Sequence, residues 1–301
     1  MLYIGVDLGT SAVKLLLMDA EGKIQKIVSR EYPLSFPHPG WSEQNPEDWW
    51  KQSLEGIKEL TAECDKSQVA GISFGGQMHG LVILDEKDEV IRPAILWNDG
   101  RTGKETDYLN QVIGKEKLSE YTANIAFAGF TAPKILWVKE HEPENFQKIK
   151  KIMLPKDYLA YKLSGVHCSD MSDASGMLLL DVKNRCWSKE MLDICGISEE
   201  QMPELFESYE TVGTLKPELA AELGIPASCK IVAGARRQCR CCCGNRNRRR
   251  RKMQYFSGNQ RNDLYFQQGV WRRPIQCPSC FCTRRWELSS HGLYVKRGFL
   301  Q

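Results

Sequence analysis

The chain has 301 residues, of which 42% are hydrophobic and 26% are charged. These proportions are typical of a globular protein and argue against a disordered chain. No apolar run approaches the roughly 20 residues that cross a membrane. The N-terminus also lacks the basic leader and cleavage site of a secreted protein. We therefore expect a cytoplasmic protein.

The net charge of +3 averages two unlike parts that meet after Ala235. Residues 1–235 carry 25 Lys and Arg against 36 Asp and Glu, and residues 236–301 carry 16 against 2, so their net charges are −11 and +14. Seven of the twelve cysteines also fall in the second part. The five in the first part are scattered, which favours reduced thiols. We predict one globular domain over 1–235 and, over 236–301, an Arg/Cys-rich tail that is not a native domain.

Strands and helices alternate in the first part. The predicted strands cover residues 3–8, 12–18, 23–32, 68–74, 81–84, 91–97 and 230–235, and the predicted helices begin at 46, 133, 155, 188 and 216. Asn45 and Pro46 are typical of a helix N-cap and first position. The polar residues 169–173 are predicted to form an irregular loop. This pattern predicts an α/β domain with a covered sheet.

A tight turn of Gly9, Thr10 and Ser11 separates the first two predicted strands. Such a turn directs backbone N–H groups and hydroxyls at one point, which suits phosphate oxygens. Asp7 lies beside it and could hold a hydrated Mg²⁺, which prefers carboxylate and water ligands. An ordinary hairpin in which Asp7 bonds its own turn explains the same residues, and this alternative stays open.

Polar residues follow two later strands. Residues 75–80 combine glycines with an amide and His79, and Asn98 and Asp99 follow the predicted strand 91–97. In open α/β sheets, ligands bind at the carboxyl ends of the strands. Amides, carboxylates and a histidine at such a place favour a polyhydroxylated ligand, although a lone histidine is more often structural.

Five motifs in this order resemble the FGGY family of carbohydrate kinases, and within it its xylulokinases, over residues 1–235. The motifs are Gly5–Ser11, His38–Pro46, Gly76–Gly80, Leu96–Thr102 and Leu154–Tyr158. The family has two actin-like (ribonuclease H-like) ATPase domains with sugar and ATP between them. The resemblance thus implies an α/β fold, the N-terminal kinase domain only, with the second domain missing. It implies phosphorylation of D-xylulose by ATP to D-xylulose 5-phosphate.

The resemblance also assigns site residues and cofactors. It implies that Asp7 serves Mg²⁺, that ATP is bound by Gly9, Thr10, Ser11 and Lys14, and that the sugar is bound by Gln77, Met78, His79, Asn98 and Asp99. The pair Met78 and His79 points to xylulose, because glycerol-phosphorylating relatives carry Arg-Glu there. D-Xylulose and ATP are the expected partners, with no nucleic acid and no membrane. A homodimer is left open.

The family's general base is an aspartate in a G-D-N-A motif that would follow Ala235. Here Arg236 and Arg237 follow instead. No catalytic residue is therefore assigned, and the chain is expected to be impaired or inactive. The alternative among enzymes is a kinase for another sugar or polyol, such as ribulose, gluconate or glycerol.

A shifted reading frame would explain the tail. If the last two nucleotides of each codon are read with the first of the next, permitted codons turn residues 237–244 into D-N-A-A-A-A-V-G. Residues 253–262 become C-N-I-S-L-G-T-S-G-T. These strings resemble the family's base motif and second phosphate loop, in the expected order.

Two alternatives remain for the tail. One is a zinc site built on the C-x2-C pair Cys277 and Cys280, with Cys282 and His291 nearby. Zinc modules usually show two well-spaced ligand pairs, and Cys239 and Cys241–Cys243 are badly spaced as the second pair. The other is nucleic-acid binding through the basic run 246–252. Either would make the chain a non-catalytic sugar-binding protein with a second ligand.

Overall fold

A computed structural model of the chain describes residues 1–236, 252–257, 260–265, 271–274 and 287–289. A six-stranded sheet forms its centre, in the order β13-β14-β5-β1-β2-β3. These strands are β1 (Leu2–Leu8), β2 (Ala12–Asp19), β3 (Ile24–Glu31), β5 (Val69–Gly76), β13 (Thr211–Thr214) and β14 (Lys230–Arg236). β1, β2 and β3 form an antiparallel meander, whereas β5 runs parallel to β1 and β14 runs parallel to β5. This mixed sheet confirms the predicted α/β fold.

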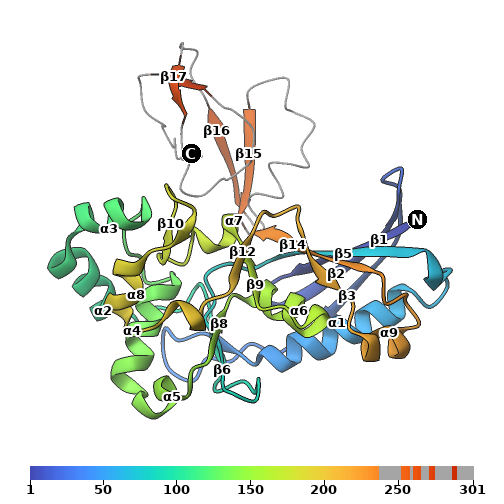
Figure 1. The fold of residues 1–301 in the computed structure, drawn as a ribbon, viewed down its shortest axis with the longest axis horizontal. Helices are drawn as coiled ribbons and strands as arrows, with labels where there is room; N and C mark the ends of the chain where they lie inside the picture. Colours follow the sequence, from blue (N-terminus) through green and yellow to red (C-terminus); the bar gives the residue numbers. More distant parts are fainter. Residues whose placement is uncertain (237–251, 258–259, 266–270, 275–286, 290–301) are drawn as a thin grey trace.

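Three helices lie below the sheet in the view of Figure 1: α1 (Pro46–Leu60), α6 (Pro155–Ser164) and α9 (Pro217–Leu223). Asn45 caps α1, as predicted, and its Oδ1 accepts a hydrogen bond of 3.1 Å from the backbone N–H of Glu47. Trp49 is fully buried in the core between α1 and the sheet. Its role is therefore packing.

A second hydrophobic core lies beside the sheet, where Figure 1 shows the remaining helices grouped to one side. The helices of this group are α2 (Gly103–Asp107), the π-helical η2 (Tyr108–Gly114), α3 (Lys115–Thr122), α4 (Thr131–His141), α5 (Pro143–Lys148), α7 (Met171–Ala174) and α8 (Lys189–Cys195). The short strands are β4 (Glu43–Gln44), β6 (Val82–Leu84), β7 (Ala94–Ile95), β8 (Lys151–Met153), β9 (Cys168–Asp170), β10 (Leu180–Asp181), β11 (Cys186–Trp187) and β12 (Glu204–Phe206). Two 3-10 turns, η1 (Lys66–Gln68) and η3 (Glu199–Gln201), complete the elements up to residue 236. The helices over 103–122 have no counterpart in the sequence prediction.

Four strands are described beyond residue 236. β15 (Lys252–Ser257) pairs with β16 (Gln260–Tyr265), and β17 (Trp271–Pro274) pairs with β18 (Glu287–Ser289), both antiparallel. The predicted zinc ligands, Cys277, Cys280, Cys282 and His291, lie outside the described residues. Most of the basic run 246–252 lies outside them as well.

The prediction of an irregular polar loop over residues 169–173 is wrong. These residues form most of β9 and α7, and all five are buried. Asp170 caps α7, because its Oδ2 accepts a 2.9 Å hydrogen bond from the backbone N–H of Ser172. Polar residues can lie in a protein interior when they satisfy one another in this way, which polarity alone does not reveal.

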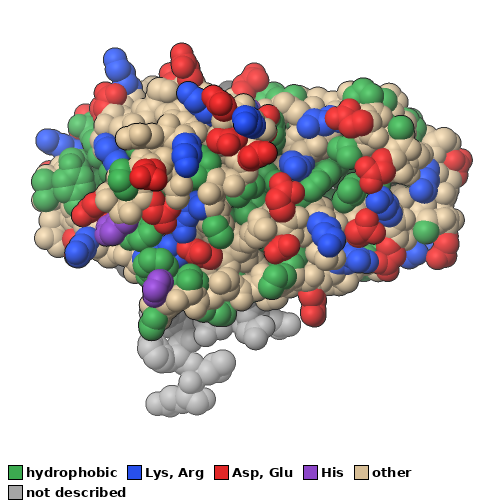
Figure 2. Space-filling view, turned by 90° about the horizontal axis from the view of Figure 1, so that it is seen from below, with side chains coloured by type: hydrophobic (Ala, Val, Ile, Leu, Met, Phe, Trp, Pro, Cys, Tyr) green, Lys and Arg blue, Asp and Glu red, His purple; other side chains and the backbone are tan. Residues whose placement is uncertain are grey.

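Within the described residues, the cysteines of the first part are free thiols, and no helix is long and apolar enough to cross a membrane. Figure 2 shows the face seen from below, where acidic and basic side chains are interspersed with apolar ones.

Gly234 permits the close contact between β14 and β5. Its φ is +76°, in an irregular stretch of the pairing between Val232 and Ala235. A Cβ there would lie 2.3 Å from the carbonyl oxygen of Phe74, which is backbone and cannot move aside. Gly234→Ala should therefore lower the free energy of unfolding by about 2–4 kcal/mol, as measured by urea denaturation.

The matched control is Gly103→Ala in α2. A Cβ at this position meets nothing within 4 Å, and its φ is not positive. Alanine favours helix over glycine, so this variant should keep or gain stability. Equal losses in the two variants would contradict the role assigned to Gly234.

Candidate active site

The predicted phosphate turn lies at the carboxyl end of β1. Residues 9–11 connect β1 to β2, and the backbone N–H of Gly9 donates to the carbonyl of Ala12 at 2.9 Å. Asp7 pairs with Lys14 across the two antiparallel strands, so their side chains share one face of the sheet. Asp7 is half-buried and Lys14 is exposed. The structure thus brings together all the residues predicted for ATP and Mg²⁺.

The end of β5 places the predicted sugar loop beside this turn. Leu8 pairs with Gly76 in parallel register, and the backbone N–H of Gln77 donates to the carbonyl of Leu8 at 2.7 Å. The indole N–H of Trp97 donates to the Thr10 hydroxyl at 3.1 Å. The loop that carries Asn98 therefore also contacts the turn. Asn98 itself is exposed.

Gln44 joins two of these segments, although the sequence assigned it no role. Its Nε2 donates to the carbonyl of Thr10 at 2.7 Å, and its Oε1 accepts from Nε2 of Gln77 and from the indole of Trp49, both at 3.1 Å. Gln44 is only 2% exposed. This role follows from the burial of Gln44, which only the tertiary structure shows.

His79 has one ring nitrogen left to accept a hydrogen bond. Its Nδ1 lies 2.7 Å from the carbonyl oxygen of Gly176, and because a carbonyl only accepts, the proton lies on Nδ1 and Nε2 is the acceptor. Burial lowers the pKa of His79 to about 3, helped by the positive charges of Arg236 and Lys134. The imidazole is therefore neutral near pH 7.

Lys134 holds the backbone around His79, which has a φ of +65°. The fully buried ammonium group of Lys134, in the first turns of α4, donates to the carbonyls of His79 and Gly129, each at 2.8 Å. Thr131 donates to the same His79 carbonyl at 3.2 Å. Burial lowers the pKa of Lys134 to about 7. The sequence prediction missed Lys134. A lysine on the apolar face of a predicted helix is the signal that could have indicated its buried role.

Asp99 is occupied by donors of the chain itself. Its carboxylate accepts from the backbone N–H of Ser42 at 2.6 Å and from the backbone and guanidinium of Arg101 at 2.7–2.9 Å. Asp99 is 2% exposed. A sugar contact through this carboxylate would have to replace one of these hydrogen bonds. The geometry therefore indicates that Asp99 fixes the conformation of its loop.

Arg236 lies against the predicted sugar loop. Its guanidinium NH2 is 3.0 Å from the sulfur of Met78, and its backbone N–H donates to the Ser172 hydroxyl at 3.2 Å. The residue is 4% exposed. The first residue after the compositional junction therefore fills space next to the half-buried Met78.

A buried ionic cluster lies beneath the end of β14. The ammonium of Lys156 is 2.5 Å from Asp157, 2.8 Å from Asp170 and 3.9 Å from Asp173. Burial opposes the charge of Lys156, but the three carboxylates raise its pKa well above the usual value. One ammonium cannot neutralise three carboxylates in a dry interior. Burial accordingly raises the pKa of Asp173 to about 8, and neither of its oxygens has a hydrogen-bond partner among the described residues.

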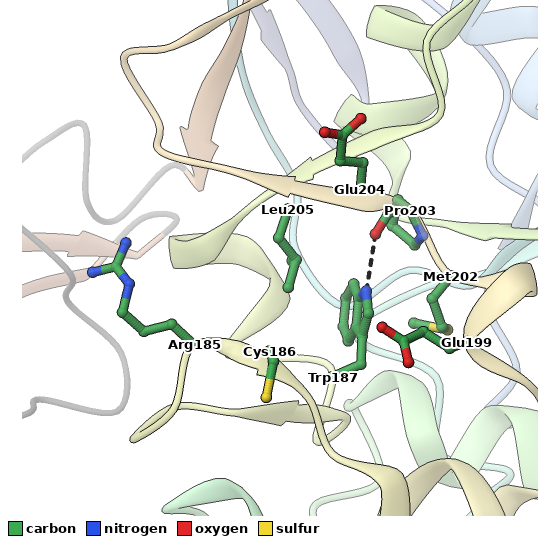
Figure 3. A pocket seen from close by; sticks show the side chains of 8 residues that line it. All are labelled: Arg185, Cys186, Trp187, Glu199, Met202, Pro203, Glu204 and Leu205. Atoms are coloured by element: carbon green, nitrogen blue, oxygen red, sulfur yellow. Dashed lines mark hydrogen bonds between the residues drawn. The ribbon is translucent and has the colours of Figure 1, made fainter.

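A surface pocket elsewhere contains none of the predicted site residues. Figure 3 shows its lining around Trp187, whose indole N–H donates to the carbonyl of Pro203 at 2.9 Å. Cys186, Met202 and Leu205 also line it. These side chains come from β11 and from the chain around η3 and β12, away from the strand ends described above.

Asp173 should make stability fall with rising pH. Its pKa is about 8 in the folded chain against a usual 3.8, so between these values the folded state binds a proton that the unfolded state does not. Unfolding free energy therefore decreases as pH rises through this window. Asp173→Asn should reduce the loss between about pH 5 and about pH 8 by about 1–3 kcal/mol, as measured by denaturant unfolding at several pH values.

The neighbouring charges that set this response are Lys156, Asp157, Asp170 and Arg236. Asp193→Asn, at an exposed aspartate of α8, is the control and should leave the pH profile unchanged. If Asp173→Asn and Asp193→Asn gave the same profile as the parent chain, Asp173 would not hold a proton in the folded state.

Comparison with known proteins identifies the family. Residues 2–243 match the FGGY family of carbohydrate kinases, N-terminal domain. The chain is 39% identical over 292 residues to the xylulose kinase of Escherichia coli (strain K12), covering 96% of this chain and 60% of that protein. It is 45% identical over 233 residues to the xylulose kinase of Bacillus subtilis (strain 168), covering 77% and 46%.

Solved structures agree with the sequence matches. The crystal structure of a xyloylose kinase from Brucella ovis superimposes with a TM-score of 0.78 at 44% identity, covering 81% of this chain and 50% of that one. The chain thus spans only about half to three fifths of the length of these relatives. The central sheet, with helices against one face and a second core beside it, is the N-terminal part of an actin-like sugar-kinase fold. The chain belongs to the FGGY family of carbohydrate kinases.

Proposed function

We propose that this chain is the sugar-binding domain of a kinase that transfers the γ-phosphoryl group of ATP to D-xylulose. The observation that carries the proposal is the meeting of two loops at one sheet edge, the phosphate turn after β1 and the Met78–His79 loop after β5. The relatives named as xylulose kinases support the substrate.

His79 is suited to orient a sugar. With its proton held on Nδ1 by Gly176, its Nε2 can accept a hydrogen bond from a sugar hydroxyl. Lys134 fixes the backbone of His79, so this acceptor is preorganised. We propose Gln77, Met78 and Asn98 as further sugar contacts, with Asp99 shaping their loop.

The turn and Asp7 are suited to the nucleotide. The backbone of residues 9–11 and the Thr10 and Ser11 hydroxyls offer donors for phosphate oxygens, and Lys14 offers a positive charge on the same face as Asp7. A carboxylate beside hydroxyl groups suits Mg²⁺, and the residues present therefore fit the ion. When bound, Mg²⁺ would neutralise phosphate charge during transfer.

The position that the family resemblance assigns to the general base carries no group that could take the proton from the attacking hydroxyl. Family resemblance places an aspartate just after Ala235, and this chain has Arg236 and Arg237 there. Arginine remains protonated at ordinary pH and cannot accept a proton. The side chain of Arg236 also lies against Met78. We therefore propose that the 301-residue chain binds D-xylulose weakly and turns it over little or not at all.

We further propose that residues 236–301 are read out of frame. The change from −11 to +14 in net charge at one position supports this, as do the family-like strings that the shifted codons allow. A cytoplasmic location, which the composition predicts, is proposed as well, and a homodimer is left open. The nucleotide sequence around codon 236 tests the frame: if it contains no continuation of the first part's frame, the proposal fails.

The substrate is tested with the frame-restored protein. We expect it to phosphorylate D-xylulose with a higher kcat/KM than ribulose, glycerol or gluconate, and the 301-residue chain to remain near background. A coupled assay of ADP release measures both. A preference of the restored protein for another of these sugars would replace xylulose as the substrate. Turnover by the 301-residue chain at the restored protein's rate would refute the role of the missing base.

The role of His79 is tested with His79→Asn in the restored protein. Asparagine tolerates a positive φ and can still donate to Gly176, but it lacks the Nε2 acceptor. The KM for D-xylulose should rise about 10–100-fold, the effect of losing one buried hydrogen bond, while the KM for ATP stays unchanged. His38→Asn, at an exposed histidine, is the control. An unchanged KM for D-xylulose in His79→Asn would contradict sugar binding by Nε2.

A further inference from the structure

A cluster of three potential metal ligands lies where α2 meets the end of α4. The residues are Glu105 of α2 and Glu140 and His141 of α4, and one ligand atom from each lies within 4.8 Å of the others. Glu140 and His141 are exposed, whereas Glu105 is only 4% exposed. None of the three belongs to the sugar and phosphate loops.

Glu105 provides the first independent indication of a ligand. Both of its carboxylate oxygens are buried and have no hydrogen-bond partner among the described residues. A buried carboxyl without a partner is costly, and a cation placed between Glu105 and Glu140 would remove that cost.

His141 is already arranged as metal-binding histidines are. Its Nδ1 lies 3.1 Å from the carbonyl oxygen of Trp137, which can only accept, so the proton lies on Nδ1. Its ring also stacks on Trp137, with centroids 4.8 Å apart and planes 9° apart. Metal-ligating histidines commonly donate their other ring N–H to a carbonyl or carboxylate. Nε2 is therefore held ready as the coordinating atom.

We propose that Glu105, Glu140 and His141 bind one divalent transition-metal ion of the Mn²⁺ or Zn²⁺ class. The donor set of one imidazole nitrogen and two carboxylates suits these ions, and the exposed side of the site leaves positions for water. The two carboxylates match the charge of a divalent cation.

The ion would join α2 to the end of α4. α2 directly follows the Trp97–Thr102 loop, and Trp137, on which His141 stacks, also lies 4.9 Å from the guanidinium of Arg101. Fixing α2 would therefore hold the loop that carries Asn98. Because the cluster is separate from Asp7, this inference stands whether or not the chain binds a sugar.

Mn²⁺ is the probe for the test, because oxygen and nitrogen donors suit it better than the thiols of the tail. The full chain is titrated in reducing buffer, and the loss of the free-ion electron paramagnetic resonance signal counts the bound Mn²⁺. The variants are Glu105→Gln and His141→Gln, which keep size and shape. Glu144→Gln, at an exposed glutamate of α5, is the charge-matched control.

The parent chain and Glu144→Gln should bind one more Mn²⁺ than the other two variants, or bind it at least about tenfold more tightly. Mn²⁺ should also raise the melting temperature of the parent chain and of Glu144→Gln more than that of Glu105→Gln. Circular dichroism establishes that each variant is folded. Identical Mn²⁺ binding by the parent, Glu105→Gln and His141→Gln would overturn the proposal, since the ion would then be held elsewhere.

Discussion

The parallel pairing of β1, β5 and β14 is the constraint on which the site depends. Parallel strands end at the same edge of a sheet, so the turn after β1, the loop after β5 and the end of β14, which contains the compositional junction, meet there. These segments are separated by more than 60 and more than 150 residues along the chain. No local interaction could bring them together. The pairing of Leu8 with Gly76, and of Gly76 with Arg236, brings the three segments together directly.

Buried charges hold this edge in place. Lys134 fixes the left-handed backbone of His79 through two carbonyls, and Lys156 neutralises part of an aspartate cluster below β14. Taking an ammonium out of water costs several kcal/mol unless it is paired or hydrogen-bonded. Both lysines are fully buried, and their partners are groups whose positions matter to the site. Removing either would leave buried acceptors or carboxylates without compensation.

Some residues of the family motifs position the loops of the site through contacts with one another. Arg101 binds Asp99 and Glu43, and its guanidinium lies 3.8 Å from the ring centre of Trp41. This contact joins the His38–Pro46 and Leu96–Thr102 motifs into one unit. Gln44 does the same between the phosphate turn and Gln77. The motifs are thus connected to each other before any ligand binds.

The amino-acid sequence determined the strands of the meander, the start of α1 at Pro46, helix α6, the family and the break after Ala235. These are local features, set by hydrophobic periodicity, caps and motifs read along the chain. It did not reveal β9 and α7, the helices over 103–122, or the structural roles of Lys134, Gln44 and Asp99. The roles of these three residues depend on which distant groups satisfy a buried polar atom, and partners 33 to 57 residues away leave no local pattern. Only the tertiary structure decided that Asp99 is bonded by its own chain, that Nε2 is the acceptor of His79, and that Glu105 is buried close to Glu140 and His141.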